Sequence, residues 1–306
     1  MRTYVLRRLL QTIPVLVGVS LIIFFSLRLI PGDPALTLAP DDADPETIEA
    51  IRARFGLDQP VHVQYARYMG GLLRGDWGQS LRTGRPVLES IVDRWQPTAT
   101  LAVLSISISI AIGVPVGVLS AVRRGSLFDR LSMVLAILSI CAPVFWIGIM
   151  MQYVFGVYLR WLPITGVGSW QHYILPSVAI ASFSLANIAR LTRAGVLEIL
   201  TREFIRTARS KGVGEGKVVF KHALRNALIP VVTLAALAFG RNLIGSIVAE
   251  TVFAIPGLGR YLIQAISNRD YVVVQGLTLV IALVYVLVNL VADLVYGVLD
   301  PRIRFD

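Results

Sequence analysis

Six long apolar runs constrain this chain more strongly than any other feature of its sequence. They cover roughly residues 9–30, 98–121, 133–158, 173–197, 228–253 and 273–298. A helix of about 20 apolar residues is long enough to cross a bilayer. Only 16% of the residues are charged, whereas a soluble domain has about 25%. We therefore expect an all-α integral membrane protein with six transmembrane helices.

The charges between these runs alternate along the chain. Segment 31–97 has seven Arg against ten Asp and Glu, whereas the segment from Arg190 to Arg225 has nine Lys and Arg against three Glu, a net charge of +6. Positive loops stay on the cytoplasmic side of a membrane. We therefore expect both termini and the 190–225 segment, here called the basic segment, to be cytoplasmic. Membrane topology then explains much of the overall charge of +10, and nucleic-acid binding is not expected.

The first apolar run has the basic start of a signal peptide, but it is too long, and Ile30–Asp33 is not a small-residue cleavage site. We expect it to remain as the first span. Residues 31–97 are too many for a plain connection, and we expect a small helical periplasmic cap there. Asp44 and Pro45 are typical of a helix start, and Gly56 of its end. A second cap helix is expected over 61–73. The cap either stabilises the first two spans or contacts an external partner.

The basic segment has the pattern of two short amphipathic helices separated by glycines. The first is expected over 202–211 and the second over 217–228, before Pro230 opens the next span. Each helix has an apolar side: Phe204, Ile205 and Ala208 on the first, and Val219, Phe220, Ala223, Leu224, Ala227 and Leu228 on the second. The glycines between them interrupt helix propensity: Gly212, Gly214 and Gly216. Such a hairpin suits either a lipid surface or a protein partner.

Catalytic and metal-binding chemistry finds little support in the sequence. The stretch 212–217 resembles a phosphate-binding loop, but Lys211 stands where that motif needs Gly and Val218 where it needs Ser or Thr. We therefore expect no ATP binding by this chain. The three histidines, His62, His172 and His222, lie in loops or at the ends of spans. They do not accompany a nucleophile within the spans, and their spacing does not suit a metal site. We expect a non-catalytic protein without a metal or other cofactor of its own.

Short motifs occur in a fixed order along nearly the whole chain. They cover residues 4–10, 30–34, 55–60, 206–212, 222–230, 251–253, 256–260, 269–271 and 300–304. Together they resemble the inner-membrane permease subunits of ABC importers, in the dipeptide/oligopeptide/nickel branch. The importers' cytoplasmic signature begins Glu-Ala-Ala, with Gly four residues after the last Ala. Ala208 and Gly212 fit this spacing, and Arg206 and Thr207 replace the Glu and the first Ala, a variant that the peptide branch commonly shows.

The resemblance implies a type I ABC importer permease fold in a bacterial inner membrane. Its parts would be a first helix (1–30), the cap (31–97), an importer transmembrane domain (98–298, with a coupling loop over 198–228) and a cytoplasmic tail (299–306). It implies a homologous second permease, two cytoplasmic ATPases that hold ATP and Mg, a periplasmic binding protein and alternating access. The residues implied in coupling to the ATPase are Arg206, Thr207, Ala208, Lys211, Gly212, Val213 and Gly214. Dipeptides, oligopeptides, glutathione and nickel complexes remain open as cargo.

Polar residues inside spans are costly and often functional. We expect five near the translocation pathway: Asn187, Arg241, Asn242, Glu250 and Asp293. Arg241 would either attract a peptide carboxylate or pair with an acid of the partner permease, and Glu250 would line an outer gate. The loop residues that would bend over the entrance are Pro256, Gly257, Leu258 and Gly259. The alternative is an ion-coupled secondary transporter in which Asp293 carries protons, although no internal repeat supports it.

Overall fold

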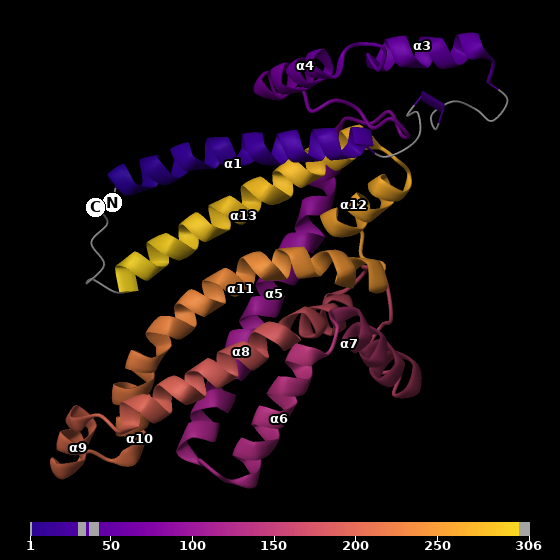
Figure 1. The fold of residues 1–306 in the computed structure, drawn as a ribbon. Helices are drawn as coiled ribbons and strands as arrows, with labels where there is room; N and C mark the ends of the chain where they lie inside the picture. Colours follow the sequence, from indigo (N-terminus) through magenta and orange to yellow (C-terminus); the bar gives the residue numbers. More distant parts are fainter. Residues whose placement is uncertain (1, 30–34, 37–42, 300–306) are drawn as a thin grey trace.

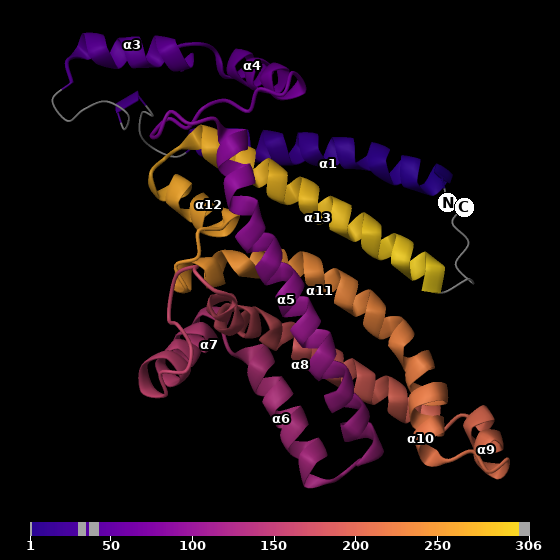
Figure 2. The ribbon, with the colours of Figure 1, turned by 180° about the vertical axis from the view of Figure 1, so that it is seen from behind.

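The structure is a computed structural model that describes residues 2–29, 35–36 and 43–299. Within these residues, five helices are long and apolar enough to cross a membrane. They are α1 (Arg2–Leu29), α5 (Val87–Val122), α8 (Ile174–Leu200), α11 (Leu224–Val252) and α13 (Tyr271–Leu299). Helices α1 and α13 lie side by side (Figure 1), and α5 crosses the bundle over most of its length (Figure 2). The prediction of a nearly all-helical membrane protein is confirmed.

The predicted span over 133–158 is not one straight helix. Helix α6 (Leu127–Cys141) and helix α7 (Val144–Met151), which continues as a π-helix over Gln152–Tyr158, meet at an angle of 111°. The break falls at Pro143, and Ala142 before it is extended (φ −77°, ψ 130°). A residue before proline is disfavoured in helical conformation, which explains the bend. Counted as one span, this pair brings the candidate spans among the described residues to six.

The two cap helices form where the sequence predicts them. Helix α3 (Pro45–Phe55) begins after Asp44, whose carboxylate accepts a hydrogen bond of 2.8 Å from the Thr47 amide, and it ends at Gly56 in the left-handed conformation (φ 64°). Helix α4 (Val61–Leu73) follows. The cap lies at the end of the bundle where α13 begins, here called the cap side (Figure 1).

Helix α5 begins at Val87, eleven residues earlier than the span predicted from residue 98. Its first turns, from Val87, extend into the region assigned to the cap, and Pro97 lies inside the helix. Val87 is fully buried and packs in an apolar cluster with Leu258 and Leu277. The proposed boundary between cap and transmembrane domain at 97/98 therefore lies within one continuous helix.

Close packing between α5 and α8 forms the centre of the bundle. A Cβ at Gly117 would lie 2.5 Å from the Ala189 carbonyl oxygen, and one at Gly113 would lie 3.0 Å from that of Leu185. Small residues let membrane helices approach closely. This contact holds α8 in place, and α8 leads directly into the next helix, which begins at Glu203.

Candidate coupling and translocation sites

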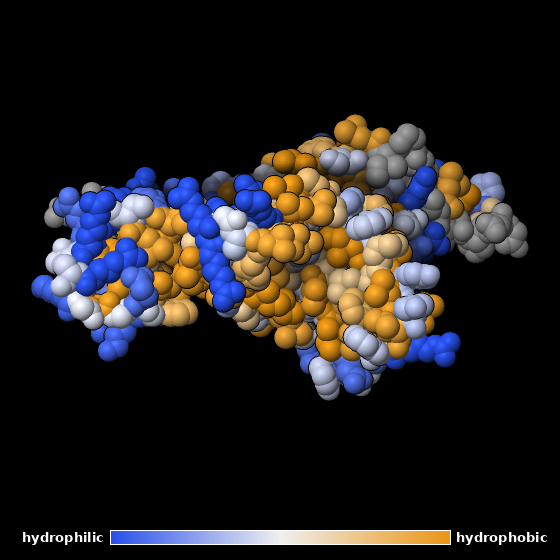
Figure 3. Space-filling view, turned by 90° about the horizontal axis from the view of Figure 1, so that it is seen from below, coloured by the Kyte–Doolittle hydropathy of each residue, from blue (hydrophilic) through white to orange (hydrophobic). Residues whose placement is uncertain are grey.

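Helix α9 (Glu203–Ser210) projects from the bundle at the end opposite the cap, here called the α9 side (Figure 1). Its one fully buried anchor is Ile205, while Arg206, Thr207 and Lys211 are exposed. Gly212 ends the helical turn in the left-handed conformation (φ 77°), and no atom lies within 4 Å of a Cβ built there. Hydrophilic side chains gather at this end of the molecule (Figure 3). The result is a short, charged helix that stands clear of the spans.

An ion pair closes the turn after α9. Arg209 Nε lies 2.6 Å from Glu215 Oε1, and Arg209 Nη2 lies 3.1 Å from Glu215 Oε2. The Val213 amide also donates to the Ala208 carbonyl oxygen at 3.1 Å. The Arg209 guanidinium lowers the pKa of Glu215, chiefly through the side-chain hydrogen bond. Both ends of the turn are thus tied together across Gly212 and Gly214.

The second helix predicted in the basic segment is not separate from the following span. A short helix α10 (Glu215–Lys217) passes through a π-helix over Val218–Ala223 directly into α11, and Pro230 lies inside α11 instead of opening it. The buried residues of this stretch pack on α5 and α8. The turn is therefore joined to α11 by consecutive helical segments with no loop between them.

Two aromatic side chains expected on packing faces are exposed. Phe204 on α9 is 46% exposed, and Phe220 in the π-helix is 65% exposed. Apolar periodicity placed both on packing faces, but Ile205 and Val218 occupy the buried positions. The π-helix changes the angular spacing of 218–223, which a 3.6-residue pattern does not anticipate.

An ion pair that the sequence did not indicate joins α6 to α8. Arg193, counted above in the basic segment, lies inside α8, and its Nε and Nη2 atoms lie 2.6 Å and 2.8 Å from the two carboxylate oxygens of Asp129. Asp129 also accepts from the Gly125 amide at 2.9 Å, and it is buried. The pair fixes the start of α6 against α8 on the α9 side.

Asn242 binds two other helices. Its Oδ1 atom accepts from Ser184 on α8 at 2.9 Å, and its Nδ2 atom donates to Ser105 on α5 at 3.0 Å. All three residues are buried. The Asn242 side-chain amide thus has hydrogen-bond partners within the bundle, and it links α11 to both α5 and α8.

The other polar residues of the spans are placed differently. Arg241 is exposed, and its guanidinium carbon lies 5.1 Å from the centre of the Phe183 ring. Among the described residues it has no ion-pair partner. Asn187 is half-buried and donates to the Phe183 carbonyl oxygen at 2.8 Å. Asp293 lies on α13, but its side chain is outside the described part of the structure. Arg241 and Asn187 thus both contact Phe183, Arg241 at its ring and Asn187 at its carbonyl oxygen.

Glu250 is fully buried at the cap side of α11 and holds the loop that follows. Its Oε1 atom accepts from Thr98 at 2.7 Å, and its Oε2 atom accepts from the Arg260 amide at 2.9 Å. A Cβ at Gly257 would lie 2.4 Å from the Glu250 carboxyl carbon, and one at Gly259 would lie 2.4 Å from the Ile247 Cα atom. Leu258, which opens helix α12 (Leu258–Ser267), is also buried, whereas Pro256 is exposed. The predicted gate loop is packed tightly against α11.

Metal binding has no support in the described ranges: nowhere in them do three or more His, Cys, Asp or Glu side chains gather as a metal ion would require.

The chain matches two family models. The family described as binding-protein-dependent transport system inner membrane component matches residues 113–305, and the N-terminal family of such membrane components matches residues 1–102. The chain is also similar to permease proteins named GsiC of glutathione transport systems. Those of Salmonella typhimurium strain LT2 and Escherichia coli strain K12 are each 45% identical over 305 residues, which covers 100% of both chains.

Solved structures share the fold at lower identity. Two inward facing structures of the MetNI methionine ABC transporter have TM-scores of 0.55 and 0.56 at 21% and 24% identity, and cover 70% and 69% of this chain and 97% and 96% of theirs. The resemblance to type I ABC importer permeases is thereby confirmed, and an ion-coupled transporter finds no support. The chain belongs to the family of binding-protein-dependent transport system inner membrane components and is a multi-pass permease subunit of an ABC importer.

Proposed function

We propose that this permease serves an importer of short peptides, with glutathione as the first cargo to test. The observation that carries the cargo assignment is the 45% identity, over the full length of both chains, to glutathione transport permeases. The exposed Arg241 agrees with an anionic cargo, since it lies in the α11 span without an acidic partner among the described residues. A charged side chain inside a span is costly and typically faces a partner group or a water-filled pathway, and a carboxylate on the cargo would complement this guanidinium.

The α9 segment is the proposed contact with an ATPase. It is exposed and charged, and Phe204 gives it an aromatic side chain that a partner's pocket would bury. Aromatic residues and arginine are enriched in the centres of protein interfaces. The rigid path from the closed turn through the π-helix into α11 would carry the ATPase's movement to the spans. In this proposal the chain itself carries no catalytic group, and ATP and Mg belong to the ATPase subunits.

The remaining partners follow from topology and surface. With α9 in the cytoplasm, the cap is periplasmic, and both termini are cytoplasmic, as positive loops favour. Large apolar side chains are exposed on the bent pair α6 and α7, including Leu131, Leu135, Phe145 and Trp146. We assign such surfaces to lipid and to a homologous second permease. A periplasmic binding protein would deliver cargo on the cap side.

Reconstitution in proteoliposomes tests the proposal. The permease pair, the ATPases and the binding protein are incorporated together, and uptake of labelled glutathione is measured with and without ATP. We expect uptake that needs ATP, the ATPases and the binding protein. Uptake by this chain alone, driven by a proton or sodium gradient, would refute the proposal, as would ATP-driven uptake that excludes peptides.

A further inference from the structure

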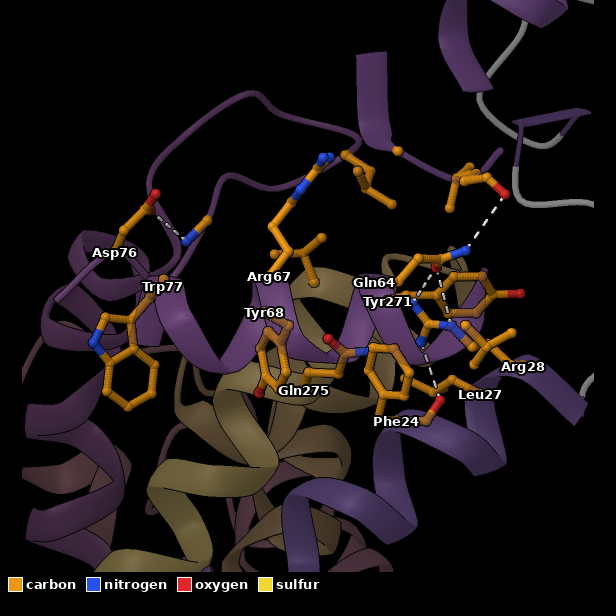
Figure 4. Close-up of a pocket in the computed structure, with 17 residues that line it drawn as sticks. Phe24, Leu27, Arg28, Gln64, Arg67, Tyr68, Asp76, Trp77, Tyr271 and Gln275 are labelled. Carbon is orange, nitrogen blue, oxygen red and sulfur yellow. Dashed lines mark hydrogen bonds between the residues drawn. The ribbon is translucent and has the colours of Figure 1, made fainter. Parts of the chain in front are cut away.

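A cavity of about 430 Å³ lies between the cap and the ends of α1 and α13 (Figure 4). Its walls come from three distant parts of the chain: the end of α1, the cap from Gly56 to Leu81, and the start of α13. Small-molecule sites are typically about 300–1,000 Å³. The cavity is separate from the proposed pathway, because neither Arg241 nor Asn187 lines it.

Arg28 brings a positive charge to this cavity, and its guanidinium carbon lies 3.3 Å from the centre of the Phe24 ring. Its Nε and Nη2 atoms donate to Gln64 Oε1 at 3.2 Å and 2.7 Å, and its Nη1 atom donates to the Phe24 carbonyl oxygen at 3.1 Å. These are neutral acceptors, and they use three of the five N–H groups of a guanidinium. Among the described residues no carboxylate pairs with Arg28. A half-buried cation of this kind is stabilised by an anion.

Two buried polar groups beside the cavity also lack partners in the part of the chain that the structure describes. Gln275 on α13 is only 5% exposed, and its amide makes no hydrogen bond with any residue that the structure describes. The buried Tyr68 hydroxyl is likewise without a partner in the described ranges, and burial raises its pKa, which keeps it a neutral donor. Buried polar groups are normally hydrogen-bonded. The Tyr68 oxygen is closed off from the cavity space, so the Gln275 amide is the group that favours a ligand with hydrogen-bonding groups of its own.

The charges around the cavity are arranged along its length. Asp76 lies at one end and Arg28 at the other, with Arg67 between them (Figure 4). One oxygen of Asp76 accepts from the Gly78 amide at 2.9 Å, which leaves the second oxygen available. Arg67 is exposed and makes no hydrogen bond or ion pair within the described part of the chain. One carboxylate and two guanidinium groups complement a ligand with one ammonium group and two carboxylates.

We propose that this cavity is a second peptide site, which binds short acidic peptides with the ammonium group at Asp76 and carboxylates at Arg28 and Arg67. The identity of the peptide rests on the proposed function, since glutathione carries these three groups. A phospholipid is the other candidate for a cavity between the cap and the ends of two membrane-spanning helices. It fits less well, because acyl chains would leave the Gln275 amide unpaired.

Calorimetric titration of glutathione into the purified full-chain complex tests the site. Arg67→Glu is the informative variant, because Arg67 has no hydrogen-bond or ion-pair partner to lose among the described residues. Arg74→Glu is its matched control, since Arg74 is an exposed cap residue that does not line the cavity. We expect at least about tenfold weaker binding for Arg67→Glu, from the loss of a charge-assisted hydrogen bond, and unchanged binding for Arg74→Glu.

A second comparison tests the orientation of the peptide. N-acetylation removes the ammonium charge, so it should weaken binding to the wild type but not to Asp76→Asn, which keeps the acceptor for Gly78. The inference is overturned if wild-type complex shows no binding at millimolar glutathione, or if Arg67→Glu and Arg74→Glu behave alike. Retained phospholipid that glutathione does not displace would also overturn it. ATP-driven uptake is measured separately, so failure of the cavity leaves the importer function standing, and failure of uptake does not decide the binding result.

Discussion

Glu250 on α11 accepts a hydrogen bond of 2.7 Å from the hydroxyl of Thr98 on α5. The same hydroxyl accepts from the Leu258 amide at 2.9 Å, so one threonine joins α5, α11 and the start of α12. Both side chains are buried. This contact makes the loop over 254–260 part of the helix packing on the cap side.

Replacement of Thr98 by Val should destabilise this junction. The change keeps the shape but leaves the buried Leu258 amide without its acceptor and removes one donor from the Glu250 carboxylate, which costs about 1–3 kcal/mol. We expect a lower midpoint of thermal unfolding in detergent, with recovery in Thr98→Ser. Ser107→Ala is the control, because the Ser107 hydroxyl is exposed and bonds only to the Val103 carbonyl oxygen of its own helix. Equal midpoints for Thr98→Val and wild type would show that the junction is not stabilising.

Gly257 has to be a glycine because of its neighbour. An added methyl group would lie 2.4 Å from the Glu250 carboxyl carbon, although the backbone itself (φ −98°) allows any residue. Overpacking of this kind costs about 1–3 kcal/mol. Gly257→Ala should therefore lower both thermal stability and uptake. In Gly245→Ala, where the nearest atom is 3.9 Å from the new methyl carbon, we expect neither change, and a matching loss there would refute the explanation.

Local signals in the sequence predicted the cap well. Asp44, Pro45 and Gly56 act on the backbone next to them, so the bounds of α3 followed from residue chemistry alone. The apolar runs likewise located the long helices. The hydropathy pattern did not predict the bend at Pro143, because the segments on both sides of the bend are apolar.

The site was harder to predict because its contacts join distant residues. Asn242 was recognised as an intramembrane polar residue, yet its partners Ser105 and Ser184 lie 137 and 58 residues away. The same holds for Arg28 and Gln64, which meet only when the cap folds over α1. Residue type identified which positions matter, and the packing of the helices decided their roles.

Gly212 should be important for coupling and not for folding. Its left-handed conformation (φ 77°) costs a residue with a Cβ about 1–2 kcal/mol, and no neighbour would clash. We expect Gly212→Val to insert and assemble normally while more ATP is hydrolysed per peptide imported. Gly216→Ala is the matched control, because Gly216 lies in helix α10 and also has open space around it. Wild-type coupling in Gly212→Val would mean that the turn has no part in transmission.

The ion pair between Arg209 and Glu215 should make the α9 turn sensitive to acid. Arg209 lowers the pKa of Glu215 in the folded chain, so the contribution is present above the ordinary glutamate range and is lost as pH falls through the folded-state value. Exposed pairs contribute little to global stability, so a local measurement is needed. A spin label at position 211 should become more mobile between pH 7 and pH 3. The label should be mobile at both values in Glu215→Gln, and an identical pH response in that variant would contradict the assignment.

Arg241 and Asn242 are neighbours in sequence, but their substitutions should affect different properties. Asn242→Ala leaves Ser105 without its donor and Ser184 without its acceptor in the bundle interior, so thermal stability should fall by about 1–3 kcal/mol. Arg241 is exposed, and its guanidinium carbon lies 5.1 Å from the centre of the Phe183 ring, so Arg241→Gln should keep its stability. If Arg241 attracts a carboxylate, Arg241→Gln should reduce uptake of free peptides more than that of C-amidated ones. Equal fractional losses would instead favour a pair with an acid of the partner permease, because a lost subunit contact lowers transport whatever the cargo's charge.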